Sequence, residues 1–473
     1  MFKYSVNPAH LSWSSYEKIL FRIIFIYFFL QIFPLDWKYY RHLSELIWLE
    51  ISFKELFHVA KYTPQFTSDY QTQDWGLATF TDWGIIFIIA LIGALIWSLT
   101  DKTRKNYQAL YSWLRVLVRY RLAIAVIAYG FLKLFSIQAP QPSISSLNTP
   151  YGDFTTWKLF SLSLGIVPGY QAFLGAVELL AGILLLFRKT TVIGATIIIF
   201  FTGNVFMSNL AYEGGEVVYS FFLVTLALFL VAYDLQRIIS LIILAKPTAP
   251  ARSGFSWTRQ QLVVRLALKS LIVLFFVIIY GFSAKRTAAK GGYHFTENPP
   301  ISGWSGLYRV TRFSIDGQDH PYNVADTLRW QNVVFEKWAT LSIKINKNFI
   351  VYNDYVETVP LPHERSDFEF AGTTGRKYYN YQADTVQHTL KLQDQEQERI
   401  NTGQQPGGPH AEPLTSPHFK ITDDQLSYGL NPDATITLSG KVDGRNIVAV
   451  LEKDNKKYLI KAVKKGRRSG LKL

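Results

Sequence analysis

The chain of 473 residues is 49% hydrophobic and 15% aromatic, and nearly all of its long apolar runs fall within the first 283 residues. It contains no cysteine, which excludes disulfides, thiolate catalysis, thiolate zinc sites and cysteine-ligated iron–sulfur clusters. The formal net charge of +14 does not indicate nucleic acid, because lysine and arginine are concentrated between the apolar runs, as in polytopic membrane proteins.

Seven apolar segments have about the length that a helix needs to cross a bilayer. They cover residues 17–33, 83–100, 117–137, 170–187, 191–210, 217–233 and 266–283. The first is followed by Pro34-Leu35-Asp36 rather than by a small-residue cleavage site, so we interpret it as a retained span.

The basic residues predict how these spans are oriented. Loops 101–121 and 234–269 hold six each, and Arg188-Lys189 lies between the fourth and fifth spans. Loops 138–169 and 211–216 contribute only Lys158, although Lys285, Arg286 and Lys290 follow the last span on the opposite side. The positive-inside rule then places the N-terminus in the cytoplasm and the C-terminal domain outside.

An amphipathic helix is expected between the first two spans, over residues 42–61. It would carry Leu46, Leu49, Phe53, Leu56, Phe57 and Ala60 on one side. Such a helix lies either on the outer membrane surface or over the end of the helix bundle.

From Gly306 onward apolar and polar residues alternate, which is typical of strands. The strands are expected within residues 306–318, 327–336, 339–346, 348–354, 388–394, 425–430 and 434–463. Asp316-Gly317 and Asp443-Gly444 indicate hairpins, and residues 434–463 predict a three-stranded meander that turns again at Asp454-Asn455. About eight to ten strands suit an antiparallel barrel or sandwich. The pattern does not show whether this barrel or sandwich encloses a cavity.

The segments group into four regions. Residues 1–116 form a two-span region with the amphipathic helix, 117–240 a four-helix core, 241–290 a linker with the seventh span, and 291–473 an external β-rich domain. The Pro/Gly-rich stretch 394–418 is expected to be a mobile loop in that domain.

Polar residues within the core are candidates for function, because a bilayer tolerates them only against a protein interior or a wet cavity. Tyr129 and Lys133 share a helix face, and Lys133 could instead reach the headgroups. Glu178 lies about halfway along its span, so it must be paired, hydrogen-bonded or protonated. Asn204 and Ser208 share a face of the next span, with Asn209 one step round. Each of these is either a ligand contact or an interhelical hydrogen bond.

The glycines, the histidines and the absence of known catalytic motifs also bear on function. Gly175, Gly182, Gly194 and Gly203 are expected at close helix contacts. All nine histidines lie outside the spans and show no metal-ligand spacing, so no metal site is expected. The sequence contains no GxSxG motif, P-loop or dinucleotide fingerprint.

The stretch from Tyr129 to Asp234 resembles the DoxX family of membrane proteins. The resemblance rests on YGFLKLF at 129–135, GAVELLAGILLLFRKTTVIGA at 175–195 and FFTGNVFMSNLAYE at 200–213. It departs at Glu213-Gly214-Gly215, where the family has an aspartate and a proline. The longer frame is similar to large bacterial DoxX-like proteins that carry extra helices and a C-terminal β-domain.

The resemblance implies a protein of the bacterial inner membrane with a periplasmic C-terminal domain. One family member is part of a thiosulfate:quinone oxidoreductase, while many have no assigned reaction. We therefore expect a membrane subunit that binds a small lipophilic molecule, quinone being the first choice, beside a redox partner. The ligand candidates are Tyr129, Lys133, Glu178, Asn204 and Asn209; no covalent cofactor is expected, and catalysis by the chain itself stays open.

Two alternatives remain. In the first, the chain is a non-enzymatic scaffold whose external domain binds an envelope protein or lipid, and the polar residues of the spans are purely structural. In the second, weaker alternative, it is a transporter, although no inverted repeat or broken helix is evident in the sequence.

Overall fold

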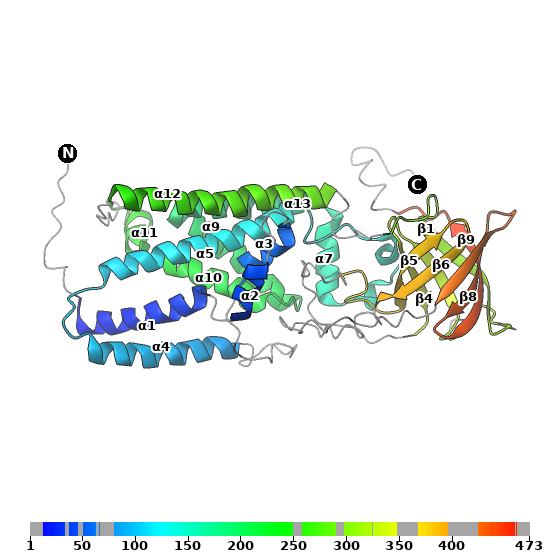
Figure 1. The fold of residues 1–473 in the computed structure, drawn as a ribbon, viewed down its shortest axis with the longest axis horizontal. Helices are drawn as coiled ribbons and strands as arrows, with labels where there is room; N and C mark the ends of the chain where they lie inside the picture. Colours follow the sequence, from blue (N-terminus) through cyan, green and yellow to red (C-terminus); the bar gives the residue numbers. More distant parts are fainter. Residues whose placement is uncertain are drawn as a thin grey trace. The chain divides into compact units, whose positions relative to one another are not determined.

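The computed structural model describes residues 13–33, 37–45, 51–62, 66, 80–248, 258–289, 298–323, 325–347, 368–395, 424–458 and 460. These residues form two compact units, a helical unit and a unit built on a β-barrel (Figure 1). The helical unit takes the chain up to Phe135 and from Ala172 to Arg286. The barrel unit takes the segment from Ser136 to Gln171 and the described residues from Thr287 onward.

The helical unit contains ten α-helices and most of an eleventh, α13, among its described residues. The ten are α1 (Ser15–Ile32), α2 (Trp37–Glu45), α3 (Phe53–Ala60), α4 (Thr81–Thr100), α5 (Gln108–Leu134), α8 (Pro168–Leu185), α9 (Thr191–Ala211), α10 (Val217–Ala232), α11 (Leu235–Ile242) and α12 (Arg259–Val273). A π-helical turn, η4 (Leu274–Ile279), joins α12 to α13 (Tyr280–Ala289), which ends at the boundary between the units. In this unit α1 packs on α4, α9 packs on α10, and α5 contacts α1, α3 and α10.

Four of the described helices are long and apolar enough to cross a membrane. They are α4, α8, α9 and the continuous helix Arg259–Ala289. A fifth candidate joins α10 to α11 across a bend of 70°. Helices α1 and α5 cover the other two predicted spans but carry more basic residues. Between its two ends, the exposed side chains of α4 are apolar, as expected of a surface that faces lipid: Phe87, Ile88, Ile89, Leu91, Ile92, Leu95, Ile96 and Leu99.

The expectation of one helix over residues 42–61 is wrong, because α2 and α3 are separate helices. Ser52 starts α3 with a capping box in which its side chain and that of Glu55 each accept a backbone N–H of the other residue. The predicted apolar residues Phe53, Leu56, Phe57 and Ala60 are buried, whereas Leu46 and Leu49 lie outside the described residues. Since α3 contacts α5 and η4, it packs into the helical unit instead of lying on its surface.

The C-terminal region is a closed antiparallel barrel of eight strands. They are β1 (Gly306–Ile315), β3 (Trp330–Phe335), β4 (Thr340–Ile345), β5 (Arg376–Asp384), β6 (Thr389–Asp394), β7 (Gln425–Leu430), β8 (Ile436–Val442) and β9 (Arg445–Asp454), with β2 (Gln318–Asp319) as a short addition to β1. Each strand pairs with the next, and β9 pairs back onto β1 from Leu307↔Asp454 to Ile315↔Ile447. Closure satisfies the edges that an open sheet would expose.

The predicted hairpins at Asp316-Gly317 and Asp443-Gly444 are confirmed. Both residues of each turn have positive φ, between 49° and 84°, as a type I′ hairpin requires. The meander differs from the prediction, because the chain leaves the sheet after Asp454 and residues 455–458 form no strand. The free edge of β9 is taken by β1. Strand β5 was not predicted, and the predicted strand 348–354 and most of the loop 394–418 lie outside the described residues.

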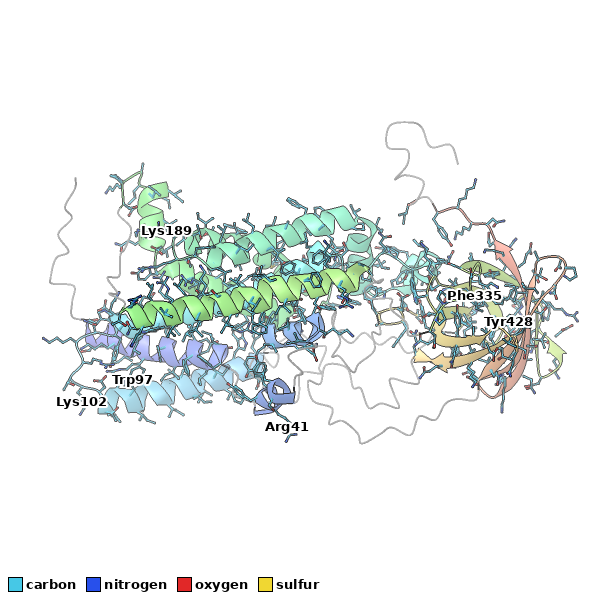
Figure 2. All side chains as sticks on the ribbon, turned by 45° about the horizontal axis from the view of Figure 1, so that its top comes forward. Arg41, Trp97, Lys102, Lys189, Phe335 and Tyr428 are labelled. Atoms are coloured by element: carbon cyan, nitrogen blue, oxygen red, sulfur yellow. The ribbon has the colours of Figure 1, made fainter. Side chains whose placement is uncertain are left out.

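The barrel interior is filled by side chains. Trp304 packs edge to face against Phe335 and Tyr428, with ring centroids 5.1 Å and 4.9 Å apart. Figure 2 shows Phe335 and Tyr428 within the barrel unit. Inward-facing residues from all eight strands join the same buried core. An eight-stranded barrel is just wide enough to be filled in this way.

The segment between the third and fourth predicted spans packs on the barrel. It forms α6 (Ile144–Leu147), the 3₁₀ turn η3 (Tyr151–Asp153) and α7 (Thr156–Ile166). Glu336 of the β3–β4 turn accepts from the Ile144 N–H at 3.1 Å, from the Ser145 N–H at 2.7 Å and from the Ser145 hydroxyl at 2.6 Å. Lys158 of α7 is fully buried and donates to the Phe368 carbonyl. These contacts fix the segment to the barrel, although the sequence suggests only a loop between two spans.

Candidate functional site

The crossing of α5 and α8 brings two backbones into contact at glycine. A Cβ on Gly175 would lie 2.3 Å from the Leu134 nitrogen and 2.6 Å from the Gly130 carbonyl oxygen, both backbone atoms. Gly182 and Gly194 also face close neighbours, so the predicted packing role is confirmed for these three glycines. It is wrong for Gly203, whose Cβ would have nothing within 4 Å.

Lys133 and Glu178 meet beside this crossing. Lys133 occupies the last turn of α5, and Glu178 lies three residues after Gly175 on α8. The Lys133 Nζ lies 2.5 Å from the Glu178 Oε1. Only 8% of Lys133 and 5% of Glu178 is exposed, so the ammonium points into the helical unit and does not reach toward solvent.

One carboxylate oxygen of this pair has no partner. The Glu178 Oε2 is buried and accepts no hydrogen bond from the described residues. The surroundings of the ammonium are aromatic, since Lys133 Nζ lies 5.9 Å from the ring centre of Tyr129 and 5.6 Å from that of Phe201 on α9. A buried acceptor without a donor costs about 1–3 kcal/mol, and more when it is charged. The site therefore has an unmet requirement for a hydrogen-bond donor.

A second ion pair, between Lys61 and Glu216, contacts α5 at Tyr129, one turn before Lys133. The Tyr129 hydroxyl donates to Glu216 Oε1 at 2.9 Å, and the Lys61 Nζ lies 2.7 Å from the same oxygen. Glu216 precedes α10, and Lys61 follows α3. The rings of Tyr129 and Tyr219 lie 5.7 Å apart. Tyr129 thus contacts both groups, its hydroxyl at Glu216 and its ring near Lys133.

Arg121 anchors α3 to this part of the helical unit. Its guanidinium donates to the Ala60 carbonyl at 2.6 Å and to the Tyr62 carbonyl. A cation at the C-terminal carbonyls of a helix is favoured by charge-assisted hydrogen bonding and by the helix dipole. The charge count placed Arg121 in the loop 101–121, although the predicted third span, 117–137, also contains it. Helix α5 begins at Gln108, so Arg121 lies inside the helix.

Lys61, Arg121 and Glu216 are the site residues that sequence reasoning missed. The signal for Arg121 was weak, because the basic residues Arg115 and Arg119 just before it are typical of a loop between spans and hid the start of the helix at Gln108. Lys61 and Glu216 lie in connecting segments, where charges are ordinarily solvated. Their pairing depends on the inward packing of α3, which the sequence does not reveal.

The predicted asparagines do not join the Lys133–Glu178 pair. Asn204 is exposed and accepts from the Ser208 hydroxyl at 3.4 Å, and none of its described hydrogen bonds reaches the pair. Asn209 donates to the Ser220 hydroxyl at 3.4 Å, which in turn donates to the Glu216 carbonyl. Of the five predicted ligand residues, Tyr129, Lys133 and Glu178 therefore lie together, and Asn209 lies near the start of α10.

The described residues contain no group of three or more histidines, aspartates or glutamates placed to hold a metal ion. The chemistry available at the site is that of one ammonium, one carboxylate with a vacant acceptor oxygen, and tyrosine. Such a set can accept a hydrogen bond at the free carboxylate oxygen and donate one from the ammonium.

Comparison with protein-family models, with curated proteins and with solved structures finds no match to this chain.

Proposed function

We propose that this chain is a seven-span protein of the bacterial cytoplasmic membrane. Its β-barrel would lie outside the cytoplasm, and its helical unit would bind the polar headgroup of a small lipophilic molecule. Quinone is the first choice, with a redox partner supplying or accepting the electrons. The observation that carries the ligand proposal is the buried, unpartnered Glu178 Oε2 beside Lys133.

The packing of α6 on the barrel supports the span count. Because α6 contacts β1 and β3, residues 144–147 and the barrel must lie on the same side of any membrane. The chain between them must then cross an even number of times. Helices α8, α9 and Arg259–Ala289 provide three crossings, so α10 is needed as the fourth despite its bend into α11.

The basic residues of α1 and α5 do not argue against their crossing a membrane. Arg22 is 4% exposed and donates to the Ser98 hydroxyl at 2.7 Å and the Tyr107 hydroxyl at 2.6 Å. Arg119 and Lys133 of α5 are also buried. Charges that face the protein interior avoid the cost of facing lipid. With α1, α4 and α5 included, the number of spans is seven.

The chemistry of the pair fits a quinone and its quinol. The unpartnered Glu178 oxygen would accept a hydrogen bond from a quinol hydroxyl, and Lys133 retains N–H donors for a quinone carbonyl. The Lys133 ammonium lies near the aromatic rings of Tyr129 and Phe201, which suit a flat ring. The resemblance to the DoxX family, one of whose members works with quinone, points in the same direction.

A thermal-unfolding titration of the full chain in lipid nanodiscs tests this proposal. A short-chain quinone at about 100 times its dissociation constant stabilises the protein that binds it by roughly 2.7 kcal/mol. We expect Glu178→Gln to abolish this shift and Asn204→Ala to leave it unchanged, since Asn204 lies apart from the pair. A shift that is equal in wild type and Glu178→Gln would refute the assignment.

The scaffold function is the second candidate, and the filled barrel favours it. Since the barrel interior is occupied by side chains, any partner of this unit would bind its outer surface. Under this alternative the Lys133–Glu178 pair only holds α5 to α8. No quinone-dependent shift would then occur in any variant, and an envelope protein or lipid would be retained by the barrel unit.

A further inference from the structure

A cluster of cations gathers at one end of the helical unit, where α5, α10 and α12 lie near the turn after α8. We define the basic cluster as Arg115, Arg119, Arg188, Arg265 and Lys269. Arg115 and Arg119 lie one helical turn apart on α5, and Arg265 and Lys269 lie one turn apart on α12. The Lys269 Nζ lies 3.8 Å from the ring centre of Phe187, the residue before Arg188, and electrostatic repulsion between Lys269 and Arg119 relates the two helices. Lys102 and Lys189 lie toward this same end of the unit, and Arg41 lies toward the other (Figure 2).

Carboxylates do not balance the buried part of this cluster. Asp234 contacts Arg115, with Oδ2 3.5 Å from the Arg115 Nη2, but it also pairs with Arg237. Within the described residues, neither Arg119 nor Lys269 forms an ion pair with a carboxylate. The Nε atoms of Arg115 and Arg119 are buried without a hydrogen-bond partner, and only 6% of Arg119 is exposed.

Aromatic rings stand where acidic groups would be expected. The Arg115 guanidinium lies 3.6 Å from the ring centre of Tyr233, and the Lys269 Nζ lies 3.8 Å from that of Phe187. Cation–π contacts hold both cations in place but do not neutralise a charge, and of the two only Arg115 has a carboxylate partner among the described residues, Asp234. An anion placed among like charges would offset their repulsion.

The surface around the cluster is apolar, which indicates where the anion comes from. Arg265 and Lys269 lie on α12 among exposed apolar side chains: Leu262, Val263, Val264, Leu266, Leu268 and Leu271. Helix α11, bent by 70° from α10, exposes Leu235, Ile239, Leu241 and Ile242. A free phosphate ion would not need this apolar surface, whereas the acyl chains of a lipid would cover it.

We propose that the basic cluster binds the phosphodiester headgroup of an anionic phospholipid, with the acyl chains along α11 and α12. Basic residues between spans on the cytoplasmic side are suited to such headgroups. The inference rests on the membrane placement proposed above and is independent of any ligand at Glu178. Arg119 forms the buried floor of the site, and Arg265 meets the lipid from its exposed rim.

Lipid binding by the detergent-purified full chain tests the proposal. Phosphatidylglycerol and phosphatidylcholine are added back separately, and the bound lipid is counted by native mass spectrometry. A basic residue near an anionic membrane surface strengthens binding about fivefold, so the Arg119→Gln/Lys269→Gln double variant should bind phosphatidylglycerol about 30-fold more weakly. Lys102→Gln removes a charge outside the cluster and should bind like wild type.

Three results would overturn the proposal: equal binding of the two lipids by wild type, undiminished phosphatidylglycerol binding by the double variant, or full displacement of the lipid by millimolar inorganic phosphate. If the double variant does not fold, Arg265→Gln replaces it, because that side chain is exposed. A carbonate wash of membranes separates this test from the proposed function. Protein that washes off refutes the membrane placement, whereas retained protein without lipid preference refutes this inference alone.

Discussion

Removing one partner of the Lys133–Glu178 pair should destabilise the helical unit far more than removing both. The two charged atoms lie 2.5 Å apart and both side chains are almost fully buried. At an effective dielectric constant of 20, their attraction is about 7 kcal/mol, and the desolvation of two ions offsets most of it. The net value of the pair is therefore small, but a lone buried charge costs about 3–5 kcal/mol.

We expect Lys133→Met to lower the unfolding free energy by about 3–5 kcal/mol and Glu178→Leu to do the same, because each leaves the other charge buried and unpaired. The double variant Lys133→Met/Glu178→Leu should lie within about 2 kcal/mol of wild type. Denaturant-induced unfolding of all four proteins in the same nanodiscs gives the coupling energy directly. Additive effects of the two single changes would refute the reasoning, since they would mean that the side chains do not depend on each other.

Three further predictions follow from packing and charge. Gly175→Ala should force α5 and α8 apart and cost about 2–4 kcal/mol, whereas Gly203→Ala should be neutral or stabilising; both are read by thermal unfolding, and equal effects would contradict the close crossing. Arg121→Gln should speed amide exchange across α3 about 100-fold, because two charge-assisted hydrogen bonds worth roughly 3 kcal/mol together are lost; unchanged exchange, as expected for Lys102→Gln, would show that α3 is held otherwise. Burial and the nearby Glu369 raise the pKa of Glu336 above its usual 4.5 despite hydrogen bonds from Ser145, so its ionisation should destabilise the barrel unit progressively as pH rises from about 4.5; Glu336→Gln should flatten this part of the stability profile, and an unaltered slope would contradict the assignment.

The sequence predicted the elements that a repeating pattern defines. Apolar runs located the helices, and alternation with Asp-Gly turns located the hairpins at Asp316 and Asp443. The sequence did not determine whether the sheet closes into a barrel, because the alternation of apolar and polar residues shows which face of a strand is buried but not which strands pair. The pairing of β9 with β1 decided it. Strand β5 was missed because it begins with Arg376 and Lys377, and because the adjacent Tyr378 and Tyr379 are both buried, so apolar and polar residues do not alternate there.

The candidate site was predictable only where a charge stood in an apolar run. Glu178 was conspicuous for this reason, and the same argument required a partner for it. Lys133 proved to be that partner because glycines let α5 and α8 approach at this level. The roles of Lys61 and Glu216 depend on the entry of α3 into the helical unit, a long-range contact that no local pattern encodes.

The docking of residues 144–166 onto the barrel is another long-range contact that could not be predicted from the sequence. Serine-rich segments between spans ordinarily indicate a loop, and the Ile-Ser-Ser-Leu turn is too short to be recognised as a helix. Its order comes from a carboxylate 191 residues away in the sequence, Glu336, which accepts three hydrogen bonds from Ile144 and Ser145. Arg376 joins the same cluster through Ser342 at 2.8 Å.

Native mass spectrometry with lipid extraction tests the central claim most directly, using the full chain gently purified from its own membrane. We expect a stoichiometric lipophilic ligand, quinone first, that is retained by wild type and by Asn204→Ala and lost from folded Glu178→Gln. The contradicting result is wild-type protein without any such ligand, accompanied by an envelope protein that remains bound when Glu178 is replaced.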